Sequence, residues 1–295
     1  MLSLVPRHAN RSRLTSLLVA LALAPVGCVH RPRPTDHLFP AAFTPMGHRG
    51  AAGLAPENTM AAFHEAAELG VPFELDVRFA AGGDLIVFHD DDLQRLAGVP
   101  GRPDQRTLAD LKQLDVSQRA DVHHRRERIP TLDEVLQVFG GRVVINVEIK
   151  AGKGADPGPI ADAVVAAIER RGLQDRVLIT SFNPFDLEKV RARAPQVRRG
   201  QIYGTFADAD LRWIEKVLLR NLAFNRRALP DLLSVEHTLV TARYLEKMHR
   251  RGYKVFAWTV NDEAEMHRLI DLGVDGIITD RPDLLLQVAG RLPAT

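Results

Sequence analysis

Short apolar segments alternate with longer amphipathic segments along most of this chain. Eight of the apolar segments have the length and composition of β-strands; these are residues 44–47, 73–77, 143–149, 177–181, 199–203, 232–235, 254–259 and 276–279. Segments between them have a helical period and end at a glycine, as at 59–69 before Gly70 and at 160–171 before Gly172. Eight strand–helix units predict one α/β domain, a (β/α)8 barrel of the TIM type, whose active site lies at the carboxyl ends of the strands.

The region after the second predicted strand has the pattern of a β-hairpin followed by an insertion. Gly82-Gly83 supplies two residues that can adopt the positive φ of a tight hairpin turn. A turn centred between these glycines would place Asp76 directly opposite His89. Residues from about 91 to 142, between this hairpin and the third strand, carry their own helix patterns. We therefore expect a rim insertion on the barrel there.

The first residues differ from the rest of the chain. Three arginines precede an uninterrupted apolar run over residues 17–26, which is the pattern of an export signal. The run is too short for a membrane-spanning helix, which needs about 20 apolar residues. We therefore predict a signal peptide over residues 1–27, an extended tether over residues 28–42 and a catalytic barrel over residues 43–295.

Cys28 is the only cysteine of the chain and directly follows the small residue Gly27. Bacterial lipoproteins carry their lipid on a cysteine at such a place. We therefore expect an exported protein at the periplasmic or cell-envelope face, in contact with the membrane through a lipid on Cys28. Pro25 departs from the lipoprotein pattern, which leaves ordinary cleavage and a secreted product open. Because a single cysteine allows no internal disulfide, the exported fold depends on its core.

The positive charge of the chain belongs to the signal segment. The formal net charge is +2, and residues 1–27 hold three arginines and no acidic residue, so that their removal leaves −1. The rest of the chain has no run of lysines and arginines. Since nucleic-acid binding needs many cationic contacts to phosphates, this class of partner is excluded. No protein partner can be inferred from the sequence.

Carboxylates gather at the ends of the second and third predicted strands. Side chains two residues apart share one face of a strand, so Glu74 and Asp76 point together, as do Glu148 and Lys150. Three carboxylates against one lysine leave an excess of negative charge, which a hard divalent cation would relieve. We interpret Glu74, Asp76 and Glu148 as ligands of one Ca²⁺ or Mg²⁺ ion. The alternative is a buried ion-pair network among Lys150, Glu148 and Glu74.

Two histidines lie near the same strand ends. His48 and His89 are candidates for general base and general acid, because an imidazole titrates near neutral pH and can take or give a proton. Arg49 and Lys150 are placed to neutralise phosphoryl oxygens. Together with the carboxylates, these residue types predict a metal-assisted site for phosphoester cleavage.

Two further residues are candidates for the substrate pocket. Glu57 follows a loop that contains glycine and proline, and we expect it to contact the substrate or to support residues that do. Trp258, at the end of the seventh strand, could form an apolar wall of a glycerol or lipid pocket, and packing in the core is the alternative. Asn58 is interpreted as the N-cap of the helix over 59–69.

The chain resembles the bacterial glycerophosphodiester phosphodiesterases in the order and spacing of short motifs between about residues 46 and 282. These motifs are Gly47-His48-Arg49-Gly50, Pro56-Glu57-Asn58-Thr59, Glu74-Leu75-Asp76-Val77, His89-Asp90, Ile129-Pro130-Thr131-Leu132, Glu148-Ile149-Lys150, Ser181-Phe182, Trp258-Thr259-Val260 and Gly276-Ile277-Ile278-Thr279-Asp280-Arg281-Pro282. The resemblance implies a phospholipase C-like phosphodiesterase barrel with a divalent cation and a histidine pair at the residues proposed above. It further implies hydrolysis of a small-molecule glycerophosphodiester, such as glycerophosphocholine or glycerophosphoethanolamine, to sn-glycerol 3-phosphate and an alcohol.

The chain departs from the family pattern directly after His89-Asp90. The family often has a Thr-rich and Gly-rich stretch there, whereas this chain has Leu96-Ala97-Gly98-Val99-Pro100-Gly101-Arg102. Substrate preference is therefore open. Two other functions stay open with it: a lysophospholipase D that acts on an acylated substrate, and a non-catalytic envelope protein that binds phosphodiesters.

Overall fold

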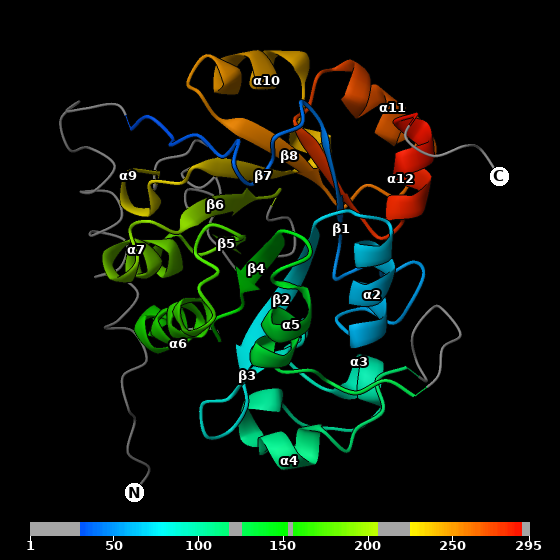
Figure 1. Ribbon diagram of the computed structural model, residues 1–295, viewed down its shortest axis with the longest axis vertical. Coiled ribbons are helices and arrows are strands. Elements are labelled where there is room, and N and C mark those ends of the chain that lie inside the picture. Colours follow the sequence, from blue (N-terminus) through cyan, green and yellow to red (C-terminus); the bar gives the residue numbers. More distant parts are fainter. Residues whose placement is uncertain (1–29, 118–125, 153–155, 206–224, 291–295) are drawn as a thin grey trace, which may run out of the picture.

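The structure is a computed structural model, which describes residues 30–117, 126–152, 156–205 and 225–290. Its centre is a closed barrel of parallel strands (Figure 1). The eight strands are β1 Thr44–Gly47, β2 Phe73–Phe79, β4 Ile145–Ile149, β5 Val177–Ser181, β6 Arg198–Tyr203, β7 Leu232–Glu236, β8 Lys254–Trp258 and β9 Gly276–Thr279. The barrel closes because β1 pairs with β2 on one side and with β9 on the other. The predicted (β/α)8 barrel is thereby confirmed.

Helices surround the barrel and bury one face each against the sheet. They are α2 Met60–Glu68, α5 Leu132–Phe139, α6 Pro157–Arg170, α7 Pro184–Arg193, α9 Asn225–Ala228, α10 Ala242–His249, α11 Glu263–Asp271 and α12 Pro282–Val288, with a 3₁₀ turn at His237–Leu239. In α5, for example, Thr131 and Glu134 form a capping box, and the face that carries Leu132, Leu136 and Phe139 is buried. The amphipathic pattern of the sequence therefore becomes the outer layer of the barrel.

The floor of the barrel, at the amino-terminal ends of the strands, is closed by the segment that precedes β1. Phe39 is buried there, with its ring centre 5.0 Å from that of Phe256. Arg33 forms an ion pair with Asp231 at 2.6 Å. Within the expected extended tether over residues 28–42, Leu38 and Phe39 therefore pack against the barrel floor, whereas most of the other described residues are exposed or half-buried.

The first described residue of this segment is also held in place. His30 Nε2 donates a hydrogen bond to the carbonyl oxygen of Pro230, at 2.9 Å. The expected signal peptide over residues 1–27 and the expected lipid site at Cys28 lie outside the described residues. Within the described residues, no helix combines the length and the apolar character needed to cross a bilayer.

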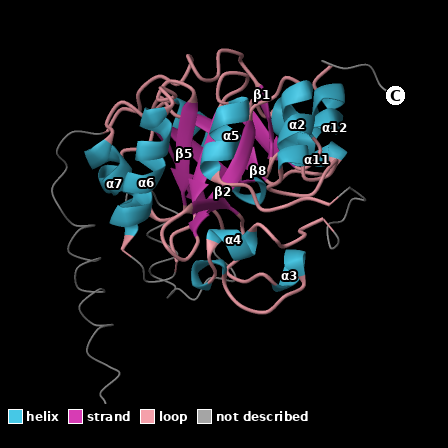
Figure 2. Ribbon diagram, turned by 60° about the horizontal axis from the view of Figure 1, so that its bottom comes forward, coloured by secondary structure: helices cyan, strands magenta, loops and turns pink. Residues whose placement is uncertain are grey.

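Between β2 and β4 the chain leaves the barrel and forms a small layer beyond one end of the strands (Figure 2). This layer holds β3 Leu85–Val87, α3 Gln94–Ala97, a 3₁₀ turn at Pro103–Gln105 and α4 Leu108–Leu111. It has a core of its own, built from Ala80, Ile86, Phe88, Leu93, Leu96, Leu111, Val116 and Ile129. Helix α5 falls within the expected insertion, 91–142, but packs in the main core, where the ring centre of Phe139 lies 5.5 Å from that of Phe73. The layer that stands apart from the barrel therefore ends before α5.

The hairpin of β2 and β3 has a register one residue away from the expected one. Val77 pairs with Val87 in the antiparallel ladder. Asp76 therefore faces Phe88, whose N–H donates to the carbonyl oxygen of Asp76 at 2.9 Å. The expected pairing of Asp76 with His89 is wrong, and His89 follows the end of the ladder.

The turn of this hairpin explains the shift. Ala80 N–H donates to the carbonyl oxygen of Asp84 at 2.9 Å, so the loop contains three residues, 81–83. Gly82 and Gly83 both have positive φ, as expected, at 97° and 93°. A three-residue loop has its centre at Gly82 itself, and this moves every cross-strand partner by one position.

Candidate active site

The candidate residues from the sequence converge on one pocket at the carboxyl ends of the strands. The pocket is lined by His48, Arg49, Glu74, Asp76, His89, Glu148, Lys150 and Trp258 among others. Glu57 stands behind this lining and accepts a hydrogen bond from Arg49 Nη1 at 2.7 Å. A barrel brings residues from distant strands together at this end because every parallel strand ends there.

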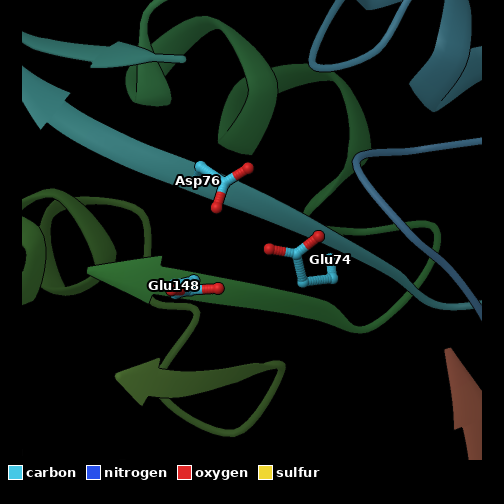
Figure 3. Close-up of side chains that lie close together, drawn as sticks. All are labelled: Glu74, Asp76 and Glu148. Atoms are coloured by element: carbon cyan, nitrogen blue, oxygen red, sulfur yellow. The ribbon is translucent and has the colours of Figure 1, made fainter. Parts of the chain in front are cut away.

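Three buried carboxylates form the centre of the pocket. Glu74 and Asp76 alternate on β2, and Asp76 is the register partner of Glu148 on β4. One carboxylate oxygen of each residue lies within 4.8 Å of the others. Figure 3 shows the three side chains pointing from the two strands toward a shared space. The spacing and the all-oxygen donor set fit a hard divalent cation.

The electrostatics of this cluster also fit a missing positive charge. Burial, together with repulsion from Asp76 and Glu148, raises the pKa of Glu74 well above its ordinary value. Glu74 Oε1 is buried and has no hydrogen-bond partner among the described residues. Burial also raises the pKa of Glu148, although Lys150 opposes this. A cation held by the three carboxylates would relieve the repulsion and occupy the unpartnered oxygen.

The alternative of a closed ion-pair network is only partly present. Lys150 Nζ lies 2.6 Å from Glu148 Oε1 and 3.3 Å from Asp76 Oδ1. The pKa of Asp76 is raised by burial but is lowered more by Lys150, His89 and Arg49, so that this carboxyl is charged. Lys150 thus pairs with two of the three carboxylates, and Glu74 is left out. Arg49 Nε adds an ion pair with Asp76 Oδ2 at 3.5 Å. These ion pairs balance part of the negative charge and leave the remainder for a cation.

Arg49 reaches the pocket from a tight loop after β1. Its backbone has a φ of 50°, and a Cβ on Gly47 would lie only 2.0 Å from the carbonyl oxygen of Gly50. The loop is fastened to β2, since Arg49 N–H donates to Glu74 Oε2 at 2.9 Å. Arg49 Nε is buried without a hydrogen-bond partner in the described ranges. Arg49 Nε lies 3.5 Å from Asp76 Oδ2, an ion pair without hydrogen-bond geometry, so its N–H can still donate to an anionic ligand such as a phosphoryl oxygen.

Each of the two histidines is bound by its own carboxylate. His48 Nδ1 lies 2.7 Å from Asp280 Oδ1, and His89 Nδ1 lies 2.7 Å from Asp90 Oδ1. Burial raises the pKa of Asp280, but the hydrogen bond from His48 lowers it further, so the carboxyl is an ionised acceptor. An ionised acceptor places the imidazole proton on Nδ1, which leaves Nε2 of His48 to accept or return a proton.

Asp90 and Asp280 are site residues that stand out in the sequence only as parts of longer motifs. Asp90 is adjacent to His89, so their pairing was open to inference from the sequence. Asp280 lies 232 residues from His48, and only the closure of the barrel, which pairs β1 with β9, brings the two together. Arg78 was also missed, and its Nε and Nη2 donate to the carbonyl oxygen of His89 at 2.8 and 2.6 Å.

Asn58 belongs to the site and does not cap α2. Its φ is 56°, its Nδ2 donates to Asp76 Oδ2 at 2.8 Å, and its Oδ1 accepts from the Asp76 N–H at 3.2 Å. Thr59 is the N-cap, because its side chain accepts from the N–H of Ala62. The predicted cap is therefore wrong by one residue. Asparagine tolerates positive φ better than most residues, which frees its side chain to hold a candidate metal ligand.

One wall of the pocket is apolar. Trp258 and Phe182 meet edge to face with ring centres 5.4 Å apart. Trp258 Nε1 is buried and has no hydrogen-bond partner in the part of the chain that the structure describes. Trp258 therefore lines the pocket, as one of its two sequence interpretations proposed, and offers both an apolar face and a free donor.

Comparison with known proteins agrees with this geometry. Residues 48–284 match the family model of the glycerophosphoryl diester phosphodiesterase family. A glycerophosphodiester phosphodiesterase of Caldanaerobacter subterraneus subsp. tengcongensis is 36% identical over 248 residues, which are 83% of this chain and 97% of that protein. A human lysophospholipase D is 28% identical over 273 residues, which are 81% of this chain and 84% of that protein.

A solved structure extends the comparison from sequence to fold. It is that of an Oleispira antarctica phosphodiesterase in complex with the product sn-glycerol-3-phosphate. The two chains are 30% identical, superpose with a TM-score of 0.73, and are covered to 84% and 96%, respectively. The family match spans most of the chain and includes the residues that line the pocket. The chain therefore belongs to the glycerophosphoryl diester phosphodiesterase family.

Proposed function

We infer that this protein hydrolyses glycerophosphodiesters to sn-glycerol 3-phosphate and an alcohol. The observation that carries this inference is the presence, in one pocket, of a buried carboxylate triad and two histidines that each have a carboxylate partner. Membership of the family and the product-bound relative support the same reaction. The combination supplies the anion binding and the proton transfer that cleavage of a phosphodiester requires.

Glu74, Asp76 and Glu148 would hold one divalent cation, and we propose Ca²⁺ or Mg²⁺. Carboxylate oxygens are the ligands that both ions prefer. When bound, the cation supplies positive charge to the phosphoryl oxygens. Asn58 assists from the protein side, because its amide fixes the Asp76 carboxylate in place.

Two cationic side chains bind the phosphoryl group in this account. Arg49 offers its Nε, which has no hydrogen-bond partner among the described residues. Lys150 lies beside the triad with its ammonium charged, since Glu148 and Asp76 outweigh burial and raise its pKa. Both groups are fixed before substrate arrives, by Glu57 and by Glu148. Positive charge that needs no reorganisation favours the transition state of phosphoryl transfer.

His48 and His89 divide the proton transfers between them. One imidazole takes a proton from the nucleophile and the other gives a proton to the departing alkoxide. Asp280 and Asp90 hold Nδ1 of the two rings and leave each Nε2 for this exchange. The nucleophile is either water or the 2-hydroxyl of the glycerol, and the second route would pass through a cyclic phosphate.

A lysophospholipase D activity is the second candidate function. The relative of that name and the apolar wall of Trp258 and Phe182 favour it. An acylated substrate needs an apolar surface beside the pocket, whereas glycerophosphocholine does not. The two activities differ in product: sn-glycerol 3-phosphate in one case, lysophosphatidic acid in the other.

We further propose that residues 1–27 are removed on export and that Cys28 carries a lipid. The pattern of the first residues supports this proposal. His30 and Arg33 are held at the barrel floor, at the end opposite to the pocket. An anchor at Cys28 would then turn the pocket away from the membrane, which favours a water-soluble diester over a lipid embedded in a bilayer.

The test is an assay of both substrates with the protein that lacks the signal peptide. We expect release of sn-glycerol 3-phosphate from glycerophosphocholine in Ca²⁺ or Mg²⁺ and none in EDTA. Release of choline from lysophosphatidylcholine alone would favour lysophospholipase D. Inactivity on both substrates with either ion would favour a phosphodiester-binding protein.

Mass spectrometry of the protein from membranes tests the proposed lipid on Cys28. A diacylglyceryl mass on Cys28 is expected, and an unmodified amino terminus would exclude it.

A further inference from the structure

Arg95 joins two parts of the site without lining the pocket. It lies on α3, in the small layer outside the barrel. Its Nη1 and Nη2 lie 2.7 Å from the two carboxylate oxygens of Glu57. Its Nε lies 2.7 Å from Asp90 Oδ2, and Nη2 lies 3.0 Å from Asp90 Oδ1. One guanidinium thus binds two carboxylates at once.

Each of these carboxylates has a second partner in the pocket. Glu57 Oε1 also accepts from Arg49 Nη1 at 2.7 Å. Asp90 Oδ1 also accepts from His89 Nδ1 at 2.7 Å. The result is a continuous chain of alternating charge that runs from Arg49 through Glu57, Arg95 and Asp90 to His89. Its two ends are the candidate phosphate-binding arginine and a candidate acid or base.

Arg95 keeps the two neighbouring carboxylates of this network charged and in place. Arg95 Nη2 contacts both Glu57 Oε1 and Asp90 Oδ1, so the two carboxylates lie close to each other across a single nitrogen. Burial raises the pKa of Glu57, but Arg95 and Arg49 lower it further, and the carboxyl is charged. Without Arg95, two like charges would repel each other, and each carboxylate would be held only by its partner in the pocket.

We propose that Arg95 is a positioning residue, which fixes the distance and orientation of Arg49 relative to His89 through Glu57 and Asp90. The proposal rests on the phosphodiesterase function inferred above. The arginine side chain is 47% exposed, so its network serves geometry more than stability. In this proposal the small layer outside the barrel contributes to the site, since its helix α3 carries the arginine that connects the two sides of the pocket.

The test compares three variants. Arg95→Met keeps the length of the side chain and removes the guanidinium, and Arg95→Lys keeps the charge but cannot bind two carboxylates in the same planar geometry. Arg102→Met is the matched control, because Arg102 forms a similar two-nitrogen pair with Asp104 in the same layer, at 2.9 and 2.7 Å. Hydrolysis of glycerophosphocholine is measured well below the melting temperature of each variant.

We expect kcat/KM to fall about tenfold or more in both Arg95 variants, with kcat lowered and KM raised. The change in kcat reports on His89, which acts in the chemical step, and the change in KM reports on Arg49, which acts in binding. Arg102→Met is expected to stay within about twofold of wild type. A wild-type kcat/KM in Arg95→Met, or an equal loss in Arg102→Met, would overturn the proposal.

A second measurement is independent of activity. In ¹⁵N-labelled metal-free protein, the Nδ1–H resonance of His89 reports the hydrogen bond to Asp90. We expect Arg95→Met to shift this resonance and to leave that of His48 in place, because His48 binds Asp280 instead. An unmoved His89 resonance would overturn the positioning claim. An inactive wild type with a shifted His89 resonance would overturn the proposed function while supporting the role of Arg95.

Discussion

His48 and His89 each depend on a carboxylate that holds Nδ1, and the two carboxylates come from distant parts of the sequence. Asp90 directly follows His89, whereas Asp280 follows β9 and reaches His48 across the closed barrel. A sequence pattern identifies the imidazoles because their residue type fits acid–base chemistry. It does not identify Asp280, because a hydrogen bond over 232 residues leaves no local periodic signal.

Replacement of Asp280 tests this pairing. In Asp280→Asn the side chain keeps its shape and loses its charge, so that the imidazole proton of His48 is no longer held on Nδ1. We expect kcat for glycerophosphocholine to fall by about a hundredfold or more, with little change in KM. The check is steady-state kinetics beside Asp283→Asn, a nearby carboxylate that pairs with Arg281 outside the pocket. A change of less than about threefold in Asp280→Asn would contradict the pairing.

Glu74 provides a prediction on pH dependence. The pKa of Glu74 in the metal-free fold is raised above its ordinary 4.5 by burial and by the two neighbouring carboxylates. The folded state therefore holds a proton that the unfolded state loses, so this group stabilises the metal-free fold at acid pH. Its contribution is lost as pH rises above about 4.5 toward the raised pKa. In EDTA, we expect stability to decline over this range.

The isosteric variant separates this effect from other titrations. Glu74→Gln removes the titrating charge, and we expect the metal-free variant at pH 7 to be more stable than wild type by about 1–3 kcal/mol. We also expect it to lose the rise in melting temperature that Ca²⁺ or Mg²⁺ gives the wild type. Thermal unfolding in EDTA and in each cation checks both statements. A Glu74→Gln variant that is less stable in EDTA and still stabilised by cations would refute the assignment of Glu74 as a ligand.

At the scale of elements, strand alternation correctly predicts which carboxylates share a face, whereas the length of one turn makes the predicted hairpin register wrong by one residue. Glu74 and Asp76 share a face of β2 because side chains two apart always do, and this holds whatever the turn does. The hairpin register depends on the number of residues in one loop, and Gly82-Gly83 fits a loop of two or of three residues equally well. His89 still lines the pocket, because Arg78 holds its carbonyl oxygen after the ladder has ended.

The start of α2 divides stability and function between two adjacent residues. Thr59 caps the helix, and Asn58 holds Asp76 with its amide. We expect Thr59→Ala to lower the free energy of unfolding by about 1 kcal/mol and to leave cation affinity unchanged. Asn58→Gly keeps the positive φ and removes the amide, and we expect it to weaken cation affinity about 10–100-fold. Isothermal titration and urea unfolding of both variants check the division, and the reverse pattern would contradict it.

At the scale of the whole molecule, the barrel was predictable and the closure of its floor was not. Eight apolar segments at helix-length intervals leave few alternatives to a (β/α)8 barrel, and this architecture places the site at one end. The segment before β1 lacks any period, because only a few of its side chains are apolar and three prolines interrupt it. Its fit to the floor depends on the shape of the space that the strands enclose, which appears only in the folded molecule.

The floor and the pocket lie at opposite ends of the barrel, so a substitution in the floor should change stability without changing activity. Phe39 is 1% exposed and packs on Phe256. We expect Phe39→Ala to lower the free energy of unfolding by about 3–5 kcal/mol and to leave kcat and KM near wild type. Val138→Ala, at a side chain that is 39% exposed, is the control and should change stability by no more than about 0.5 kcal/mol. A loss of activity in folded Phe39→Ala would show that the two ends are coupled.

The most direct measurement of the central claim is the release of sn-glycerol 3-phosphate from glycerophosphocholine by the wild type, by His48→Gln and by Glu148→Gln. Each is assayed in Ca²⁺, in Mg²⁺ and in EDTA, with folding confirmed by circular dichroism. We predict turnover by the wild type that requires a divalent cation and is lost in both variants. Turnover that persists in EDTA, or in either folded variant, would contradict the account of a cation-dependent phosphodiesterase built on this pocket.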